Sequence, residues 1–200
     1  MSQQPPREPT HPIDPLFLRR WSPRAFDGST ISEAELLTLL EAARWAPSGF
    51  NLQPWRFLYG RRDTPAWGLI HDALVPFNQA WAQNASALVA VASRTHTQPT
   101  DGSAPQPIRS TAFDAGAAWA SLAFQSVLSG WSSHAVGGFD ADKLRANLGV
   151  PESHVLHAVI VIGKPGDKAA LPEALQAREQ PSPRRPLAEI AGEGRFAFAD

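Results

Sequence analysis

The sequence predicts an α+β protein in which helices dominate and a few strands are buried. Two apolar runs, 87–93 and 156–162, suit strands that are buried on both faces of a sheet. An amphipathic helix is predicted over 33–45, and a helix rich in Ala, Gly and Ser is predicted over 113–129. We find no internal repeat and no linker, so these elements are expected to form one domain over 15–200.

The composition excludes several classes of protein. The 200-residue chain is 43% hydrophobic and 18% charged, which is typical of a globular protein. A formal net charge of −1 gives no overall attraction for nucleic acid, so any anion site is local. No apolar run approaches the roughly 18 residues of a membrane span. The absence of cysteine excludes disulfides and thiolate chemistry and fits a cytoplasmic protein, and the Pro-rich residues 1–14 are expected to be a flexible lead-in.

The helix over 33–45 has clear start signals. Ser32 and Glu35 have the spacing of a capping box, and Ile31 and Leu36 have the spacing of a hydrophobic staple. The helix is therefore expected to begin immediately after Ser32.

Shorter elements follow this helix. A strand over 56–59 is expected to end at Gly60, and two helical pieces are expected over 65–74 and 76–83. The polar stretch 95–108 is long for a loop, which leaves open a lid or a disordered surface excursion.

The Ala-rich helix over 113–129 has little polar surface, so we expect it to be buried nearly all round. Gly130 suits the residue after its C-cap. Such a helix lies either at the centre of the molecule or at a subunit interface. Asp140 then caps a short helix that ends near 148, and the second apolar strand ends at Gly163.

Basic residues gather near both ends of the domain. Arg20 and Arg24 flank Ser22, and Ser22 and Arg24 are two residues apart, so an extended segment places them on one face. Guanidinium groups bind phosphate through paired donors, and Arg184 and Arg185 offer a second bidentate donor. The alternative is a solvated basic face, and we favour the phosphate site.

A second polar segment, 46–55, follows the helix over 33–45. Backbone amides at Ser48 and Gly49, with the side-chain amides of Asn51 and Gln53, suit the polar edge of a heteroaromatic ring. Because the basic segment and this segment flank one helix, we expect them to meet at one end of it. The alternative is a structural turn, since Ser and Gly are ordinary turn residues.

Other motifs are weaker. Gly137 and Gly138 permit a close approach of the backbone to a flat ligand, or form a plain turn before Asp140. The six histidines lack the spacing of a metal site. GxSxG, Walker-type and GxGxxG motifs are absent from the sequence, so hydrolase, nucleotide-triphosphatase and Rossmann functions lack support.

In their order along the chain, these segments resemble the motifs of the nitroreductase family of FMN-dependent oxidoreductases. Arg20-Trp21-Ser22-Pro23-Arg24 is similar to the family's Arg-x-Ser-x-Arg/Lys motif, and 46–55 is similar to its APSxxNxQPW motif. Asn78 resembles a flavin-contacting asparagine, Gly137-Gly138 resembles the glycine turn beside the flavin ring, and 184–187 resembles an R-x-P-L motif. The resemblance extends from about residue 15 to residue 190.

The resemblance implies a nitroreductase-like α+β fold, in which helices surround a central, mostly antiparallel sheet. It further implies an entwined homodimer that binds FMN between subunits, with a C-terminal arm that reaches the partner. The residues that it assigns to the phosphate and flavin edge are Arg20, Ser22, Arg24 and Arg184, and those that it assigns to the ring are Ser48, Gly49, Asn51, Asn78, Gly137 and Gly138. Trp21, also placed at the cofactor, stands where members often carry His or Arg, and Trp81 stands where well-known bacterial nitroreductases have lysine.

The implied activity is ping-pong transfer of a hydride from NADH or NADPH to flavin N5 and then to a nitroaromatic, quinone or enone. No protein nucleophile is required, and Arg24 is expected to stabilise the negative charge of the reduced ring. The partners implied are a second copy of the chain and a small acceptor, without nucleic acid or membrane. The alternatives are a flavin-dependent oxidase, dehydrogenase or dehalogenase that acts on a specific small substrate, and a non-catalytic FMN-binding dimer.

Overall fold

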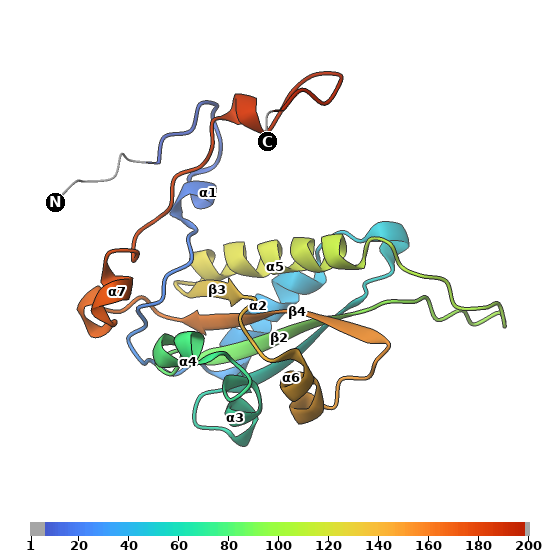
Figure 1. Ribbon diagram of the computed structural model, residues 1–200, viewed down its shortest axis with the longest axis horizontal. Helices are drawn as coiled ribbons and strands as arrows, with labels where there is room; N and C mark the ends of the chain where they lie inside the picture. The colour runs from blue at the N-terminus through green and yellow to red at the C-terminus, as the bar shows by residue number, and fades with distance from the viewer. Residues whose placement is uncertain (1–6, 199–200) are drawn as a thin grey trace.

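The two apolar runs form the centre of the sheet in the computed structural model, which describes residues 7–198 (Figure 1). Strands β2 (Ala87–Arg94) and β4 (His154–Gly163) pair in the middle, with β1 (Trp55–Arg61) and β3 (Ser132–Val136) at the edges. The order is β1-β2-β4-β3, and every pairing is antiparallel. The predicted α+β class with an antiparallel sheet is confirmed.

Helices cover both faces of this sheet. Alternation along β2 directs Leu88 toward one core cluster and Val89 toward the other. The first cluster includes side chains of α3, α4 and α6, and the second includes side chains of α2 and α5. Among residues 7–198, no helix is both long and apolar enough to cross a membrane. The helices are α1 (Pro15–Arg19), α2 (Glu33–Arg44), α3 (Pro65–His71), α4 (Pro76–Ala82), α5 (Thr111–Leu128), α6 (Ala141–Leu148) and α7 (Glu173–Gln176).

Helix α2 begins as its sequence predicts. The Ser32 hydroxyl accepts a hydrogen bond from the Glu35 amide (3.2 Å), and the Glu35 carboxylate accepts one from the Ser32 amide (3.0 Å). Ile31 and Leu36 are both buried in the α2–α5 cluster. The capping box therefore fixes the first turn, and the staple residues direct it onto the sheet.

Helix α5 ends as predicted but is less buried than predicted. The Trp131 amide donates to the Ser126 carbonyl (2.8 Å) and the Gly130 amide donates to the Val127 carbonyl (3.2 Å), which is a Schellman end with Gly130 at φ +74°. Only one stripe of the helix is buried, and Phe113 on another side is 83% exposed. The expectation of burial nearly all round is wrong within one chain, because α2 and the sheet cover a single face. Of the two positions proposed for this helix, a subunit interface remains open.

Two further corrections concern the strands. Gly60 does not end β1, because it pairs with Leu88 in the sheet, and a Cβ on Gly60 would lie 2.5 Å from the Ala66 carbonyl oxygen. Glycine is needed there because α3 packs directly on the strand. The edge strand β3 is absent from the sequence-based prediction, because its polar Ser132 and Ser133 lack the apolar signal of a buried strand.

The long segment 95–108 is paired at its base. His96 and Pro107 form an isolated β-bridge, the Ile108 amide donates to the Thr95 carbonyl (2.8 Å), and the Thr97 amide donates to the Gln106 carbonyl (2.8 Å). The segment projects away from the sheet as a narrow excursion (Figure 1).

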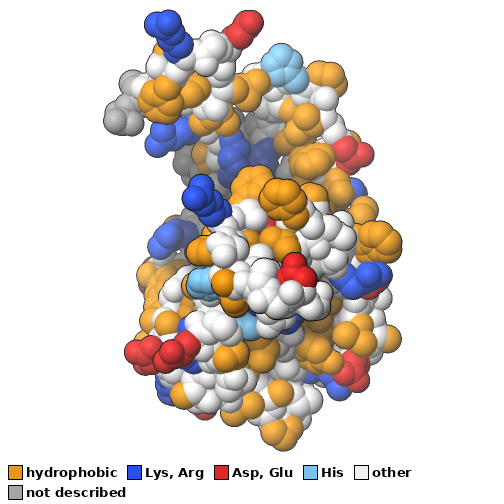
Figure 2. All heavy atoms as spheres, turned by 90° about the vertical axis from the view of Figure 1, so that its right-hand side faces the viewer, with side chains coloured by type: hydrophobic (Ala, Val, Ile, Leu, Met, Phe, Trp, Pro, Cys, Tyr) orange, Lys and Arg blue, Asp and Glu red, His pale blue; other side chains and the backbone are white. Residues whose placement is uncertain are grey.

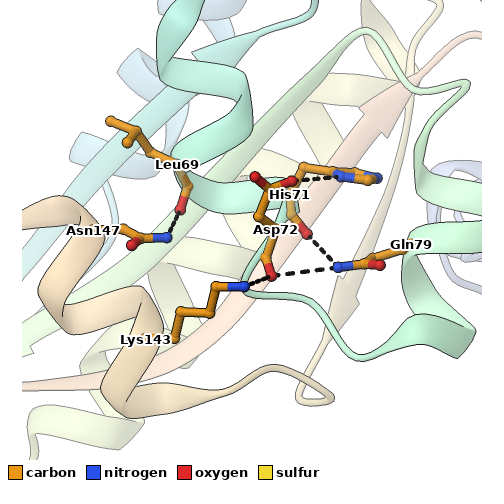
Figure 3. Close-up of polar contacts among 6 residues, drawn as sticks. All are labelled: Leu69, His71, Asp72, Gln79, Lys143 and Asn147. Atoms are coloured by element: carbon orange, nitrogen blue, oxygen red, sulfur yellow. Dashed lines mark hydrogen bonds and ion pairs between the residues drawn. The ribbon is translucent and has the colours of Figure 1, made fainter.

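Side chains from α4 and α6 close the C-terminal end of α3, and we call these contacts the α3 terminal cluster (Figure 3). The Lys143 ammonium donates to the Asp72 carbonyl (2.7 Å), the Asn147 amide donates to the Leu69 carbonyl (2.9 Å), and the Gln79 amide donates to the His71 carbonyl (3.3 Å). A helix end leaves such carbonyls without helical partners. These bonds therefore satisfy the end of α3 and fix the position of α4.

Candidate functional site

A cavity of about 160 Å³ lies where the two ends of the described chain meet. The N-terminal and C-terminal segments run side by side there (Figure 1), and the Arg7 Nε donates to the Ser182 carbonyl (3.0 Å). We call it the arginine cavity. Its lining residues are Arg7, Arg20, Trp21, Ser22, Arg24, His134, Arg178, Gln180, Ser182 and Arg184. The structure thus brings the predicted Arg20, Trp21, Ser22, Arg24 and Arg184 around one space.

The cavity carries concentrated positive charge. Among residues 7–198, none of its five arginines forms an ion pair with a carboxylate within 4 Å. Burial, followed by repulsion from Arg184, lowers the pKa of both Arg7 and Arg20. Burial, followed by repulsion from Arg178, lowers the pKa of Arg24, and the nearby Glu179 carboxylate opposes this shift. Because arginine stays charged at neutral pH, this cluster has the chemistry to hold a phosphate group.

Backbone contacts hold the segment that carries Arg20 and Arg24. The Glu179 carboxylate accepts hydrogen bonds from the Arg24 and Ala25 amides (2.7 and 2.8 Å), so its nearest polar partners are backbone groups. His134 Nδ1 lies 2.9 Å from the Pro23 carbonyl oxygen, which can only accept, so this nitrogen carries a proton. Burial is the main cause that lowers the pKa of His134, and the Pro23 bond opposes it. A neutral imidazole therefore fixes the segment without adding charge.

Trp81 of α4 connects this segment to the protein core. Its side chain is 1% exposed, its ring lies 5.0 Å from the His134 ring, and the Arg24 guanidinium carbon lies 6.0 Å from its ring centroid. Trp81 is thus a buried aromatic side chain that packs beside Arg24.

Asn78 and the glycine turn lie together, one helical turn along α4 from Trp81. Asn78 is buried, and its amide donates to the Gly138 carbonyl (2.9 Å). A Cβ on Gly138 would lie 2.6 Å from that amide nitrogen, whereas Gly137 is exposed with open space around it. Glycine is therefore required at position 138 because the Asn78 side chain lies close against its backbone.

The segment Ser48–Asn51 is strained and partly exposed. The Gly49 amide donates to the Asp114 carboxylate (3.2 Å), so it is already engaged within the chain, and a Cβ on Gly49 would lie 2.8 Å from the Ser110 hydroxyl. Phe50 and Asn51 have φ values of +51° and +54°, and Phe50 is fully exposed. Strain of this kind in residues other than glycine is typical of functional segments.

Within one chain, this segment does not meet the arginine cavity, and the expectation that the two polar segments share one end of α2 is wrong. Helix α5 separates them. Gly49 contacts Asp114 in the first turn of α5, whereas Arg20 and Ser22 lie beside residues 119–124, which project mostly from the opposite side of that helix. The sequence could not show this, because the packing of α5 on α2 is a tertiary contact.

A second hollow, of about 280 Å³, adjoins the arginine cavity at Arg20 and Ser22. Its remaining walls are largely apolar and come from α5 and β3: Trp119, Ala120, Ala123, Phe124 and Ala135. Together, the two hollows suit a ligand with an anionic end and a less polar body.

Sequence reasoning missed five residues of the arginine cavity. Arg178, Gln180 and Ser182 occupy alternate positions that continue to Arg184, and this spacing was a signal that could have found them. Arg7 and His134 carry no such signal, because only the tertiary structure brings them to the site.

Comparisons with known proteins identify the family of this chain. The family model described as "Nitroreductase family" matches residues 18–64 and 61–164. A Mycolicibacterium smegmatis protein, "Uncharacterized 15.4 kDa protein in ask 5'region", is 32% identical over 70% of this chain and 97% of its own length. An "NADH dehydrogenase" of Thermus thermophilus is 29% identical over 86% of this chain and 91% of its own. A crystal structure described as an oxidoreductase containing FMN is 47% identical, covers 100% of both chains and superposes with a TM-score of 0.94.

Proposed function

The chain belongs to the nitroreductase family, and from this premise we propose that it is an FMN-dependent oxidoreductase. Its donor is NADH or NADPH, and its acceptor is a flat, electron-poor molecule such as a nitroaromatic, a quinone or an enone. The FMN-containing structure that is 47% identical over its full length supports the cofactor, and the "NADH dehydrogenase" relative supports the donor.

The observation that carries this proposal is the arginine cavity. Five guanidinium groups without a carboxylate partner, among the described residues, suit a phosphate monoester. The adjoining hollow, with its apolar walls, suits the rest of an FMN molecule. On this proposal Arg20, Ser22 and Arg184 hold the phosphate.

The flavin ring would supply the redox chemistry, accepting a hydride and passing it on in a ping-pong sequence. The residues of this chain bind and orient. Asn78, fixed to Gly138, would supply a rigid polar group to the ring, and Arg24 would supply a positive charge. In an Arg24→Ala variant that still holds FMN, the flavin potential should fall, and an unchanged potential would remove Arg24 from this role.

The functional unit that we propose is a homodimer. Segment 48–51 of each subunit would complete the site of the other, since α5 separates it from the arginine cavity of its own chain. Exposed apolar side chains support such an interface, among them Phe50 (100% exposed) and Phe113 (83%). Figure 2 shows hydrophobic side chains spread over this side of the molecule, with the terminal segments standing above the body. The exposed C-terminal residues Ile190 and Phe196 are proposed to reach the partner.

Cofactor analysis of the purified protein tests the proposal. We expect a yellow protein with about one FMN per chain, bleached rapidly by NADH or NADPH and recoloured by a nitroaromatic or a quinone. Indifference to both nicotinamides would favour an oxidase, dehydrogenase or dehalogenase that acts on a specific substrate. A reduced flavin that reacts with no acceptor would favour a non-catalytic FMN-binding dimer. A colourless protein that takes up no added flavin would refute the proposal, and sedimentation as a monomer would refute the shared site.

A further inference from the structure

Alternate residues of the segment 178–184 line the arginine cavity, and we call this segment the C-terminal strap. Arg178 and Arg184 are its two charged lining residues, with Gln180 and Ser182 between them. Glu179 does not line the cavity, and its carboxylate accepts hydrogen bonds from the backbone amides of Arg24 and Ala25. The strap is thus fixed across the segment that carries the family's phosphate-binding motif.

Arg7 fixes the strap from the other side. Its Nε donates to the Ser182 carbonyl (3.0 Å), and its Nη1 donates to the carbonyls of Leu18 (2.8 Å) and Arg20 (2.9 Å). Within residues 7–198, Nη2 makes no hydrogen bond, and the side chain lines the cavity. One guanidinium therefore joins the N-terminal lead-in, the end of α1 and the strap.

The cavity holds more arginines than the sequence motifs supply. The motifs account for Arg20, Arg24 and Arg184, and the tertiary structure adds Arg7 and Arg178. Arg178 is exposed at the cavity and forms no ion pair with a described carboxylate, so its donors are available to a ligand. Two extra cations held at one cavity without an ion pair to a described carboxylate need a reason, because their mutual repulsion destabilises the free protein. The Glu179 carboxylate offsets part of this charge at Arg24, but its hydrogen bonds go to backbone amides.

We propose that Arg178 binds the phosphate of the cofactor directly and that Arg7 is a positioning residue, which holds the strap so that Arg178 and Arg184 both face that phosphate. This inference rests on the proposed function. It extends the phosphate site beyond the motifs shared with the family, and it makes the lead-in of this chain part of that site.

Flavin titrations of the apoprotein test the proposal. FMN and riboflavin differ only by the phosphate, so their two Kd values separate phosphate contacts from ring contacts. In Arg178→Gln we expect the Kd for FMN to rise about 10- to 100-fold, as for loss of a charge-assisted hydrogen bond, with the Kd for riboflavin unchanged within about twofold. Arg178→Lys should recover part of the loss. Arg185→Gln is the matched control, because Arg185 is adjacent to Arg184 but does not line the cavity.

Arg7 is tested by a double-mutant cycle. Arg7→Gln should raise the Kd for FMN by a smaller factor, and this factor should shrink in the Arg178→Gln background, because Arg7 acts in part through Arg178. If the ratio of the Kd for FMN to the Kd for riboflavin is unchanged in Arg178→Gln, the direct contact is overturned. If Arg7→Gln raises both Kd values by the same factor, the positioning role of Arg7 is overturned.

Inorganic phosphate separates failure of this inference from failure of the proposed function. If the wild-type protein binds neither flavin, the proposed function fails, and the melting temperature is then measured with and without phosphate. If phosphate raises the melting temperature of the wild type, and raises it less in Arg178→Gln, the anion site is still supported. If phosphate does not raise the melting temperature of the wild type, the anion site is overturned.

Discussion

The arginine cavity and the α3 terminal cluster both gather polar side chains from distant parts of the chain, but they satisfy them differently. In the α3 terminal cluster, Lys143, Asn147 and Gln79 each donate to a backbone carbonyl at a helix end (Figure 3). In the arginine cavity, five positive charges lie together, and none forms an ion pair with a carboxylate among the described residues. The first arrangement contributes to folding, and we propose that the second lowers the stability of the free protein and is relieved when an anion binds. On this proposal, charge without an ion pair, rather than polarity alone, marks the functional region.

The sharpest test of this difference is the double variant Arg20→Gln, Arg184→Gln. Loss of two charge-assisted contacts should weaken FMN binding by about 3–6 kcal/mol, whereas the free protein should be as stable as the wild type or more stable, because repulsion is relieved. Flavin titration and urea unfolding of the apoprotein measure the two quantities. If the free energy of unfolding of the free protein fell as much as the free energy of FMN binding, the cavity would be structural.

The converse test alters the α3 terminal cluster. Lys143→Met with Asn147→Leu removes two bonds to carbonyls of Leu69 and Asp72, and should reduce the free energy of unfolding by about 1–2 kcal/mol. The FMN Kd, measured under conditions where the protein stays folded, should not change. A large change in that Kd would show that the two regions are coupled through α4, which carries both Gln79 and Asn78.

The smallest expected effect concerns pH. Burial lowers the pKa of His134 in the folded protein, so below about pH 6.5 the unfolded chain binds a proton at this position before the folded chain does. Stability should therefore fall as pH decreases from 7 to 5, and His134→Gln should lessen that fall by at most about 1.4 kcal/mol per pH unit. Urea unfolding at several pH values measures this slope. His11→Gln serves as the control for loss of an exposed imidazole, and an identical slope in the His134 variant would contradict the assignment.

Sequence-based prediction succeeded where the signal lies in residues that are close together along the chain. The capping box at Ser32 and Glu35, the Schellman end at Gly130 and the cap at Asp140 are all present as predicted. Strand β3 was missed because an edge strand needs little apolar surface. The exposure of Phe113 was missed because helix composition indicates how much surface can be buried, but not which partner buries it.

The sequence by itself determined the α+β class, the two central strands and the arginines that bear the motif, because short-range spacing and side-chain chemistry encode them. Only the tertiary structure decided that Arg7 and His134 join those arginines, and that α5 separates segment 48–51 from them. These relations join residues more than a hundred positions apart or depend on how one helix packs on another. No local pattern specifies such contacts, since they follow from the burial of apolar faces across the whole chain.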